Sequence, residues 1–507
     1  MSARHPCFDT TDSVAKRHCL PCNARTTSSF CQEIKPINSA IRFVVLFANL
    51  LVLAVSAQQS CAAPLSEETL AFGPFETIHV YRGSARPTHV VIFISGDGGW
   101  NLGVTDMAQE LARLDSLVVG IDITVYLKHL ATESGACTYS AATFEELSQF
   151  LEKHYGYPDY VLPVLVGYSS GATLVYATLA QAPPNTFRGG ISLGFCPDLP
   201  LLRPLCHGSG LLYGRNQKTR GFTFLPVPHL QSPWIALQGD LDRVCDASVA
   251  AHFVTETGNA RLVRLPKVGH GFSVPRNWLP QFRESFNQLV TDVQKPALVN
   301  PPALRGLPLV EVTVENPGKT FAIIVSGDGG WASIDKSLAD ALAADGIPSV
   351  GLDSLHYFWT KRTPEEAGEA LQAIVQFYLA NWRMDKIILI GYSRGADVLP
   401  FMVNRLPPES VSHISLITLL GAAHSVDFEL HMTDWLPGGT KEAPYKILPE
   451  VEKLAGHKLL CIYGEDESAP LCPDLESASF KSVKMPGGHH FRGDYKGLAA
   501  LILRAAR

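Results

Sequence analysis

The sequence predicts two tandem α/β domains, each built on a mostly parallel, doubly wound sheet. The first observation is an internal repeat, because the six residues SGDGGW that begin at Ser95 recur letter for letter from Ser326. The second is that apolar runs alternate with amphipathic stretches after each copy, which is typical of strand–helix–strand units. The third is that these apolar runs are continuous, as in strands whose two faces are both covered by helices.

Length and composition agree with a multidomain globular protein. The chain has 507 residues, whereas one domain takes about 150. Hydrophobic residues make up 46% and charged residues 18% of the chain, which excludes a mainly disordered or collagen-like protein. With 42 Lys and Arg against 48 Asp and Glu, the net charge is -6. We therefore expect no nucleic-acid partner, because the chain has no basic field to attract one.

The N-terminal segment is expected to direct export. Residues 41–57, IRFVVLFANLLVLAVSA, form an apolar run with Lys35 and Arg42 near its start and a small-x-small pattern at its end. This pattern predicts a signal peptide. The alternative is an uncleaved N-terminal anchor, because about 17 residues are at the lower limit for spanning a bilayer. We expect residues 1–40 to be a disordered leader and exclude them from the domains.

Two segments, 70–293 and 309–507, each fit one α/β domain, and the proline-containing stretch 294–308 between them favours an extended linker. In the first segment we expect strands at 90–95, 118–121, 162–166, 191–193, 233–237 and 261–265. In the second we expect, in order, a strand at 321–326, a helix at 334–344, a strand at 348–352, a helix at 364–382, strands at 386–391, 459–463 and 480–485, and a closing helix at 495–505.

A candidate nucleophile lies where one of these strands ends and a helix begins. Residues 391–395, GYSRG, match the G-x-S-x-G elbow of α/β-hydrolases in its strand–turn–helix context. Ser393 would be the nucleophile, and the helix N-terminus behind it favours negative charge on an acyl oxygen. The alternative is an ordinary turn in which Ser393 caps the helix. Ser169 occupies the same place in the first segment, in GYSSG.

A serine nucleophile needs a general base and an acid, and an α/β-hydrolase carries them in the order Ser, acid, His. Acidic residues and then a histidine follow later strands of both segments in this order. The spacing G-x-x-D/E after the strand favours Glu467 in the second segment, with Asp466 as its rival. The predicted catalytic sets are Ser393, His489 and Glu467 or Asp466 in the second segment, and Ser169, His270 and Asp242 in the first.

The repeated SGDGGW follows an early strand, where such hydrolases carry a loop that donates one oxyanion N–H. In the second segment, Gly327, Asp328 and Gly329 would surround the oxyanion, and the backbone N–H of Arg394 would be the second donor. The equivalent second donor in the first segment is Ser170. The loop lacks the Lys-Ser/Thr ending of a phosphate-binding loop. This chemistry requires no metal and no cofactor.

SGDGGW, GYSRGADVLPF (391–401) and PGGHHF (486–491) together resemble the bacterial virulence protein VirJ/AcvB family of exported α/β-hydrolase-like proteins. The resemblance implies two tandem α/β-hydrolase-like domains in the periplasm, with Ser393 as nucleophile and His489 as base. For AcvB-like members it implies hydrolysis of the aminoacyl ester of lysyl-phosphatidylglycerol and a link to type IV secretion. The implied partners are an aminoacyl phospholipid at the outer face of the inner membrane and secretion-system proteins.

The residues beside Ser393 fit such a substrate. Asp397, with Asp328 or Asp353, would favour the lysyl ammonium, while Arg394 would meet the phosphate. Ordinary surface pairs are the alternative for each of these residues. Two other functions stay open: a general exported esterase or peptidase, and a non-catalytic periplasmic adaptor for a secretion apparatus, because a fold does not fix a function.

Six cysteines lie beyond the N-terminal segment, and an exported chain can pair them in an oxidising compartment. They are Cys137, Cys196, Cys206, Cys245, Cys461 and Cys472. The nearest pairs in sequence are Cys196 with Cys206 and Cys461 with Cys472, but spacing alone does not fix the connectivity.

Overall fold

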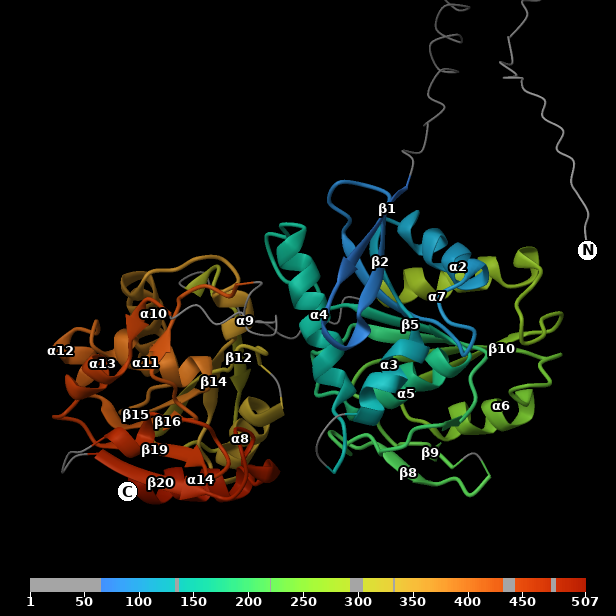
Figure 1. Ribbon diagram of the computed structural model, residues 1–507. Coiled ribbons are helices and arrows are strands. Elements are labelled where there is room, and N and C mark those ends of the chain that lie inside the picture. The colour runs from blue at the N-terminus through green and yellow to red at the C-terminus, as the bar shows by residue number, and fades with distance from the viewer. Residues whose placement is uncertain are drawn as a thin grey trace, which may run out of the picture. The chain divides into compact units, whose positions relative to one another are not determined.

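The computed structural model describes residues 65–132, 136–218, 220–291, 304–331, 333–431, 443–475 and 480–507. The predicted leader (1–40), the apolar segment 41–57 and most of the linker 294–308 lie outside the described residues. None of the helices in the described ranges is long and apolar enough to cross a membrane. We call residues 65–291 the first unit, coloured blue to green in Figure 1, and residues 304–507 the second unit, coloured yellow to red.

The first unit contains an eight-stranded sheet in the order β1-β2-β4-β3-β5-β6-β10-β11. Strands β2 and β4 pair antiparallel, as do β1 and β2, and the strands from β4 to β11 pair parallel. The strands are β1 (Ser66–Ala71), β2 (Thr77–Arg82), β3 (His89–Ile94), β4 (Ser116–Ile121), β5 (Val164–Tyr168), β6 (Gly189–Leu193), β10 (Trp234–Gly239) and β11 (Ala260–Leu265). A separate three-stranded sheet contains β7 (Asp198–Leu199), β9 (Phe222–Leu225) and β8 (Leu212–Arg215).

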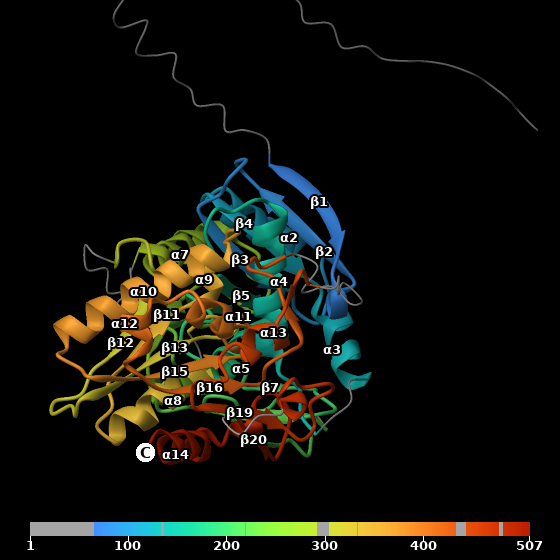
Figure 2. The same ribbon diagram turned by 90° about the vertical axis from the view of Figure 1, so that its left-hand side faces the viewer.

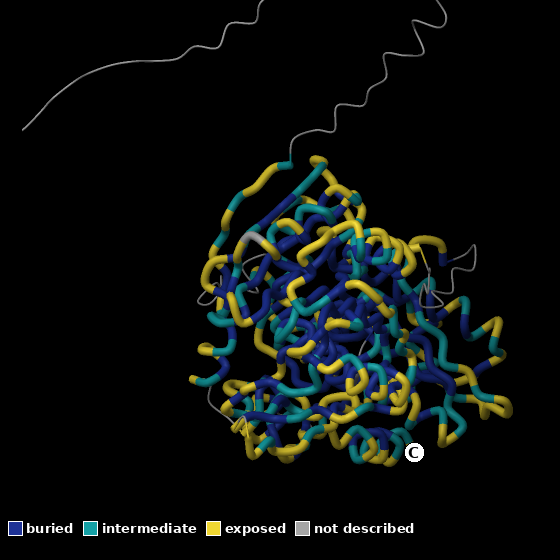
Figure 3. Tube along the Cα trace, turned by 90° about the vertical axis from the view of Figure 1, so that its right-hand side faces the viewer, coloured by how far each residue is buried: buried dark blue, intermediate teal, exposed yellow. Residues whose placement is uncertain are grey.

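Helices cover both faces of this sheet. Successive residues of a strand point to opposite sides, so a continuous apolar strand makes both faces of the sheet apolar. The helices are α2 (Leu102–Ala112), α3 (Ile123–Thr132), α4 (Ser140–His154), α5 (Ser170–Gln181), α6 (Ala247–Glu256) and α7 (Leu279–Thr291). In β3, Ile92 packs in a core with residues of α3, α4, α5 and α6, whereas Phe93 packs in a second core with residues of α2 and α7. The continuous apolar runs of the sequence thus form strands buried on both faces, drawn dark blue in Figure 3.

The second unit contains a seven-stranded sheet in the order β12-β14-β13-β15-β16-β19-β20, in which β12 alone runs antiparallel to its neighbour. The strands are β12 (Leu309–Val312), β13 (Thr320–Val325), β14 (Ser349–Leu352), β15 (Lys386–Tyr392), β16 (Ile414–Leu420), β19 (Leu459–Gly464) and β20 (Phe480–Met485). A short antiparallel pair joins β17 (Ser425–Val426) to β18 (Tyr445–Lys446). Figure 2 shows the succession β13, β15, β16, β19 and β20.

Helices cover both faces of the second sheet as well. They are α8 (Ser333–Ala344), α9 (Ser354–Tyr357), α10 (Pro364–Asn381), α11 (Arg394–Val403), α12 (Pro408–Val411), α13 (Leu448–Glu452) and α14 (Tyr495–Ala506). Ile323 of β13 packs with residues of α10 and α11, and the adjacent Ile324 packs with residues of α8 and α14. The predicted α/β class with mostly parallel, doubly wound sheets is confirmed in both units. Strand β16 and the small sheet of β7, β8 and β9 were not predicted.

The two sheets have the same strand order from the antiparallel strand onward: β2-β4-β3-β5-β6-β10-β11 in the first unit and β12-β14-β13-β15-β16-β19-β20 in the second. The repeated tryptophan also packs alike. A Cβ on Gly120 would lie 2.0 Å from the ring of Trp100, and a Cβ on Gly351 would lie 2.0 Å from the ring of Trp331. Each tryptophan therefore needs a glycine on the neighbouring strand, and both serve as packing residues for the repeated loop.

Candidate active site

Both predicted nucleophiles sit on a sharp turn at the carboxyl end of a central strand. Ser169 lies between β5 and α5 with φ 57° and ψ −121°, and Ser393 lies between β15 and α11 with φ 52° and ψ −120°. A positive φ is uncommon for residues other than glycine and is typical of strained functional turns. The turn also requires glycine nearby, because a Cβ on Gly171 would come within 2.3 Å of the Ile94 carbonyl oxygen.

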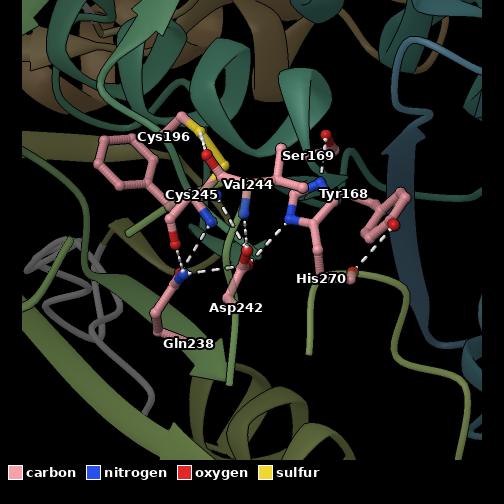
Figure 4. A network of polar contacts seen from close by, with 9 residues as sticks. Tyr168, Ser169, Cys196, Gln238, Asp242, Val244, Cys245 and His270 are labelled. Atoms are coloured by element: carbon pink, nitrogen blue, oxygen red, sulfur yellow. Dashed lines mark hydrogen bonds and ion pairs between the residues drawn. A yellow bond between two sulfur atoms is a disulfide. The ribbon is translucent and has the colours of Figure 1, made fainter. Parts of the chain in front are cut away.

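The first unit holds a complete hydrogen-bonded triad (Figure 4). Ser169 Oγ lies 2.9 Å from His270 Nε2, and His270 Nδ1 lies 2.8 Å from Asp242 Oδ2. An ionised carboxylate only accepts hydrogen bonds, so Nδ1 carries the ring proton and Nε2 is left to accept the Ser169 hydroxyl proton. The three residues that sequence order grouped together are thus in contact.

The loop after β10 fixes the Asp242 carboxylate. Its Oδ1 accepts the backbone N–H groups of Val244 and Cys245, both at 2.9 Å, and its Oδ2 accepts from Gln238 Nε2 at 3.2 Å. The side chain of Asp242 is completely buried. These donors hold the acid in the one orientation in which it meets His270, as Figure 4 shows.

In the second unit, Glu467 and not Asp466 contacts the histidine. His489 Nδ1 lies 2.5 Å from Glu467 Oε1, and Glu467 Oε2 accepts the Gly464 N–H at 3.1 Å. Asp466 is exposed in the same loop. Burial lowers the pKa of His489, but the hydrogen bond and the negative charge of Glu467 outweigh it, so the pKa is raised overall. Within the described residues, Ser393 Oγ makes no hydrogen bond to His489.

Tyrosines that precede the two nucleophiles position the histidine loops, a role that the sequence interpretation missed. The Tyr168 hydroxyl donates to the His270 carbonyl oxygen at 2.9 Å, and the Tyr392 hydroxyl lies 3.4 Å from the His489 carbonyl oxygen. Tyr392 also lies 3.1 Å from His490 Nδ1. Burial, followed by the charge of His489, lowers the pKa of His490. The signal was present in the sequence, because GYS recurs in both copies.

The predicted oxyanion loops lie beside the nucleophiles. A Cβ on Gly96 would be 3.0 Å from Ser169 Cβ, and a Cβ on Gly327 would be 3.4 Å from Ser393 Cβ. Glycine thus allows the SGDGGW loop to approach the serine closely. The loop of the second unit includes Asp328 and Gly329 as well, both exposed. The backbone N–H of Arg394 lies at the start of α11, directly after Ser393.

Asp353 supports this loop and is engaged with its own surroundings. It caps α9 by accepting the His356 N–H at 3.1 Å, and its Oδ2 pairs with His356 Nδ1 at 3.1 Å. Burial acts to raise the pKa of Asp353, but the hydrogen bond and charge of His356 outweigh it, so the pKa is lowered. Its counterpart Asp122 accepts the Trp100 N–H of the first loop at 3.2 Å. The backbone N–H of Trp331 in the second loop likewise interacts with Asp353. Asp353 therefore holds the loop, and Asp397 is the candidate ligand for a cation.

Asp397 is a buried carboxyl group one turn after Ser393 on α11. Its Oδ1 accepts the Ala423 N–H at 2.7 Å. Burial raises its pKa to about 7, against the hydrogen bond from Ala423 and the charges of Arg394 and His489. The first unit has Thr173 at this place, whose hydroxyl donates to the Cys196 carbonyl oxygen at 2.6 Å. The two sites therefore differ in charge at the same position.

Arg394 follows Ser393 and extends toward the loop after β17. Its Nη1 donates to the Asp427 carbonyl oxygen at 2.8 Å, and Asp427 in turn pairs with His431 at 2.8 Å. Arg394 is half-buried. This hydrogen bond to a backbone oxygen holds the Arg394 guanidinium in the candidate site of the second unit.

Two of the three disulfides in the described residues tie the loops that carry the acids. The pairs are Cys137 with Cys206, Cys196 with Cys245, and Cys461 with Cys472. Of the two nearest-neighbour pairs, Cys461–Cys472 is present and Cys196–Cys206 is wrong. Cys196 follows β6 and Cys245 follows β10, which pair in parallel, so the carboxyl ends of these strands bring the two cysteines together.

Asp242, Cys245 and His270 also lie close enough to resemble a metal-ligand cluster. The Cys245 sulfur is bonded to Cys196, and the Asp242 carboxylate is bonded to His270 and to backbone N–H groups. A disulfide sulfur offers no thiolate to a metal. The cluster is part of the triad and does not form a separate ligand set.

Sequence comparison decides the family. The family model described as bacterial virulence protein (VirJ) matches residues 88–189 and 319–507. The chain belongs to the VirJ family. The first range lies in the first unit of this VirJ-family chain, and the second range lies in the second unit. No curated protein sequence matches the chain.

Comparison with solved structures gives matches to about half of the chain. An esterase domain from Rhodothermus marinus is 16% identical and covers 44% of this VirJ-family chain and 98% of its own, with a TM-score of 0.30. A putative dienelactone hydrolase from Klebsiella pneumoniae is 13% identical over 45% and 98%, with a TM-score of 0.32. The Francisella virulence factor BioJ is 13% identical over 50% and 96%, with a TM-score of 0.31. These likenesses concern the fold alone.

Proposed function

We propose that this VirJ-family protein is a serine hydrolase that cleaves carboxylic esters. One observation carries the proposal: Ser169, His270 and Asp242 form a continuous hydrogen-bonded chain at 2.9 and 2.8 Å. In this arrangement the histidine can take a proton from the serine, and the buried carboxylate stabilises the imidazolium that forms.

The reaction proceeds in two steps. Ser169 Oγ attacks the ester carbon while its proton moves to His270 Nε2, and His270 then gives that proton to the leaving alcohol. Water hydrolyses the acyl-enzyme in the second step, with His270 again acting as base. The backbone N–H of Ser170 at the start of α5 and the loop at Gly96 lie beside Ser169, where donors stabilise a developing oxyanion.

The second unit uses the same chemistry with Ser393, His489 and Glu467. The His489–Glu467 pair is already formed, and the proposal requires the Ser393 hydroxyl to reach His489 when substrate is bound. Catalytic hydrogen bonds are often loose before substrate binds. The donors of its oxyanion hole are the Arg394 N–H and the loop of Gly327, Asp328 and Gly329.

The substrate that we propose for the second unit is the aminoacyl ester of a phospholipid such as lysyl-phosphatidylglycerol. Asp397 offers a buried carboxylate near the nucleophile for an ammonium group, and Arg394 offers a guanidinium for the phosphate. The VirJ/AcvB-like motifs support the same substrate. Residues 41–57 would place the protein in the periplasm, where the outer face of the inner membrane presents this lipid and where secretion-system proteins are candidate partners.

Serine labelling tests whether the protein is a serine hydrolase, and lysine release tests the proposed substrate. The full chain, Ser169→Ala and Ser393→Ala are each treated with a fluorophosphonate probe and with lysyl-phosphatidylglycerol. Labelling at both serines and loss of lysine release in Ser393→Ala alone are the expected results. Labelling without lysine release would leave a general esterase or peptidase. Absence of labelling at both serines would contradict the hydrolase and favour a non-catalytic adaptor.

A further inference from the structure

Exposed large apolar side chains gather in the first unit. Within the described ranges, all of them precede residue 275: Tyr139, Leu202, Leu212, Leu225, Leu241, Val244, Val249 and Val274. Single exposed apolar residues are common on proteins, but a cluster around a functional site marks an interaction surface.

Four of these residues lie on or next to the two loops that carry the acid and the base of the triad. Leu241 and Val244, on either side of Asp242, are 62% and 69% exposed. Val249 is in the first turn of α6, and Val274 lies four residues after His270. The two loops are joined, because the Leu241 N–H donates to the Val268 carbonyl oxygen at 3.0 Å. We call Leu241, Val244, Val249 and Val274 the apolar rim.

Cationic side chains alternate with the apolar rim. Arg243 lies between Leu241 and Val244, and Lys267 and Arg276 are exposed on the histidine loop. Three acidic groups lie on the same loops: Asp242 is buried in the triad, Asp240 is paired, and Asp246 is exposed, so the cations are in excess. Asp240 pairs with Arg264 at 2.9 Å, and Asp246 accepts the Ser248 N–H at the start of α6.

The fold does not require this surface, because the described residues of the second unit's two triad loops lack it. Glu467 follows Gly464 at the same spacing as Asp242 follows Gly239, which places Asp466 at the position of Leu241 and Ala469 at the position of Val244. Both Glu465 and Asp466 are exposed there. Beside its triad the first unit thus exposes the apolar rim, three cations and Asp246, whereas the second exposes Asp466 and Glu465, which pairs with Arg492 at 3.5 Å.

We propose that the apolar rim, with Arg243, Lys267 and Arg276, docks the first unit on the surface of an anionic phospholipid bilayer, with the mouth of its triad toward the lipid. Aliphatic side chains on protruding loops can enter the boundary between headgroups and acyl chains, while cations contact lipid phosphates. A protein partner would be met better by aromatic residues on a flat patch, whereas the rim is wholly aliphatic and interrupted by charges. The inference stands whichever ester the first unit cleaves.

Hydrogen exchange on the full chain provides a local test. Vesicles of phosphatidylglycerol and phosphatidylethanolamine are compared with vesicles of phosphatidylcholine, using Ser169→Ala so that turnover plays no part. We expect slower exchange in segments 240–249 and 266–277 with the anionic vesicles only, and no change in segment 465–472 of the second unit. Residues 41–57 are present in every sample. Because exchange is read in the two loop segments, membrane binding by residues 41–57 does not by itself produce the expected protection.

Two triple variants distinguish binding through the apolar rim from nonspecific binding by other exposed apolar residues. Leu241→Ser with Val249→Ser and Val274→Ser should abolish the protection and weaken vesicle affinity by about tenfold, and Arg243→Ser should weaken it by about fivefold. The matched control, Leu202→Ser with Leu212→Ser and Leu225→Ser, removes exposed apolar residues outside the two triad loops and should change neither. Hydrolysis of a water-soluble ester by the rim variant serves as the folding control.

Three results would overturn the proposal. One is equal protection with phosphatidylcholine vesicles, and another is protection that the rim variant retains. The third is protection that rises with protein concentration in the absence of vesicles, because it would assign the surface to a second copy of the chain. A rim variant that loses vesicle binding but hydrolyses the soluble ester normally would separate docking from catalysis.

Discussion

In the first unit the serine hydroxyl already contacts its histidine at 2.9 Å, whereas in the second unit only the histidine and its acid are in contact. The elbows themselves hardly differ, since Ser169 and Ser393 have φ values of 57° and 52°. The acids do differ. Asp242 is held by two backbone N–H groups, while the longer Glu467 is held by one. The same scaffold therefore reaches the histidine with two different acids.

The larger difference lies around the triads. One turn after the nucleophile, the first unit has a neutral threonine and the second has the buried carboxyl group of Asp397. In the loop that carries the acid, the first unit exposes Leu241, Arg243 and Val244 together with Asp246, whereas the second unit exposes Glu465 and Asp466. The two copies thus share the arrangement of serine, histidine and acid and differ in the apolar and charged groups around it.

The strongest test of the comparison removes each nucleophile in turn. Ser169→Ala and Ser393→Ala should each lower turnover at their own site by on the order of 10⁴- to 10⁶-fold, because the attacking oxygen is lost. Each variant is the control for the other. Turnover of a separate substrate for each site is measured in both variants. Unchanged turnover at the altered site would show that its serine is not the nucleophile.

The choice of acid in the second unit is tested by paired substitutions. Glu467→Gln should reduce turnover by about 10⁴-fold, because the amide neither fixes the histidine tautomer nor stabilises the imidazolium. Asp466→Asn, one residue away and exposed, should change turnover by less than about twofold. Steady-state kinetics on the Ser393-dependent substrate measures both, and an inverted ranking would assign the acid to Asp466.

The disulfides offer a test that should act on one unit at a time. Replacing Cys196 and Cys245 together by Ser should cost the first unit about 2–4 kcal/mol of unfolding free energy and loosen the loop that holds Asp242. The equivalent change at Cys461 and Cys472 should act on the second unit. Site-resolved hydrogen exchange during denaturation shows which unit is affected. Equal effects of both pairs on both units would contradict the assignment.

Asp397 should make the free energy of unfolding depend on pH. Burial raises the pKa of Asp397 to about 7, well above the usual range of an aspartate, so the folded state binds its proton more tightly than the unfolded state does. This carboxyl group therefore lowers stability progressively as the pH rises from about 4 to about 7. Asp397→Asn keeps an oxygen for the Ala423 N–H and should raise the unfolding free energy by about 2 kcal/mol at pH 8, but not at pH 3. Urea unfolding at the two pH values measures the difference.

The same variant tests substrate choice. Because the ionised Asp397 is the proposed partner of a substrate ammonium, Asp397→Asn should lower kcat/KM for a lysyl ester about tenfold relative to a neutral aminoacyl ester. Thr173→Val in the first unit is the matched control and should leave this ratio unchanged. A constant ratio in Asp397→Asn would remove the carboxylate from substrate recognition.

The smallest expected effects concern the tyrosines behind the histidine loops. Tyr168→Phe removes a 2.9 Å hydrogen bond to the His270 carbonyl oxygen, whereas Tyr392→Phe removes a weaker contact of 3.4 Å to His489. We expect turnover to fall about fivefold in the first variant and about twofold in the second, since one neutral hydrogen bond contributes about 1 kcal/mol. Restored turnover at lower temperature, with unchanged pH dependence, would mark these residues as positioning residues.

The sequence by itself determined the α/β class, the repeat, the elbow serines and the order of the triad, because each depends on local periodicity or on glycines that a tight turn requires. The order of the strands, however, follows from pairing between distant segments, and so does the partner of each cysteine. Cys196 meets Cys245 only because β6 and β10 are neighbours in the sheet.

Tertiary structure alone decided between Glu467 and Asp466, since adjacent residues of one loop point in different directions and only the position of His489 selects one of them. It also made Asp353 a loop-holding residue, bound to His356, and left Asp397 buried beside the second nucleophile. The exposure of Leu241 and Val244 is equally a property of the folded chain. Local sequence fixes which groups can react, and packing fixes which of them meet and which face the solvent.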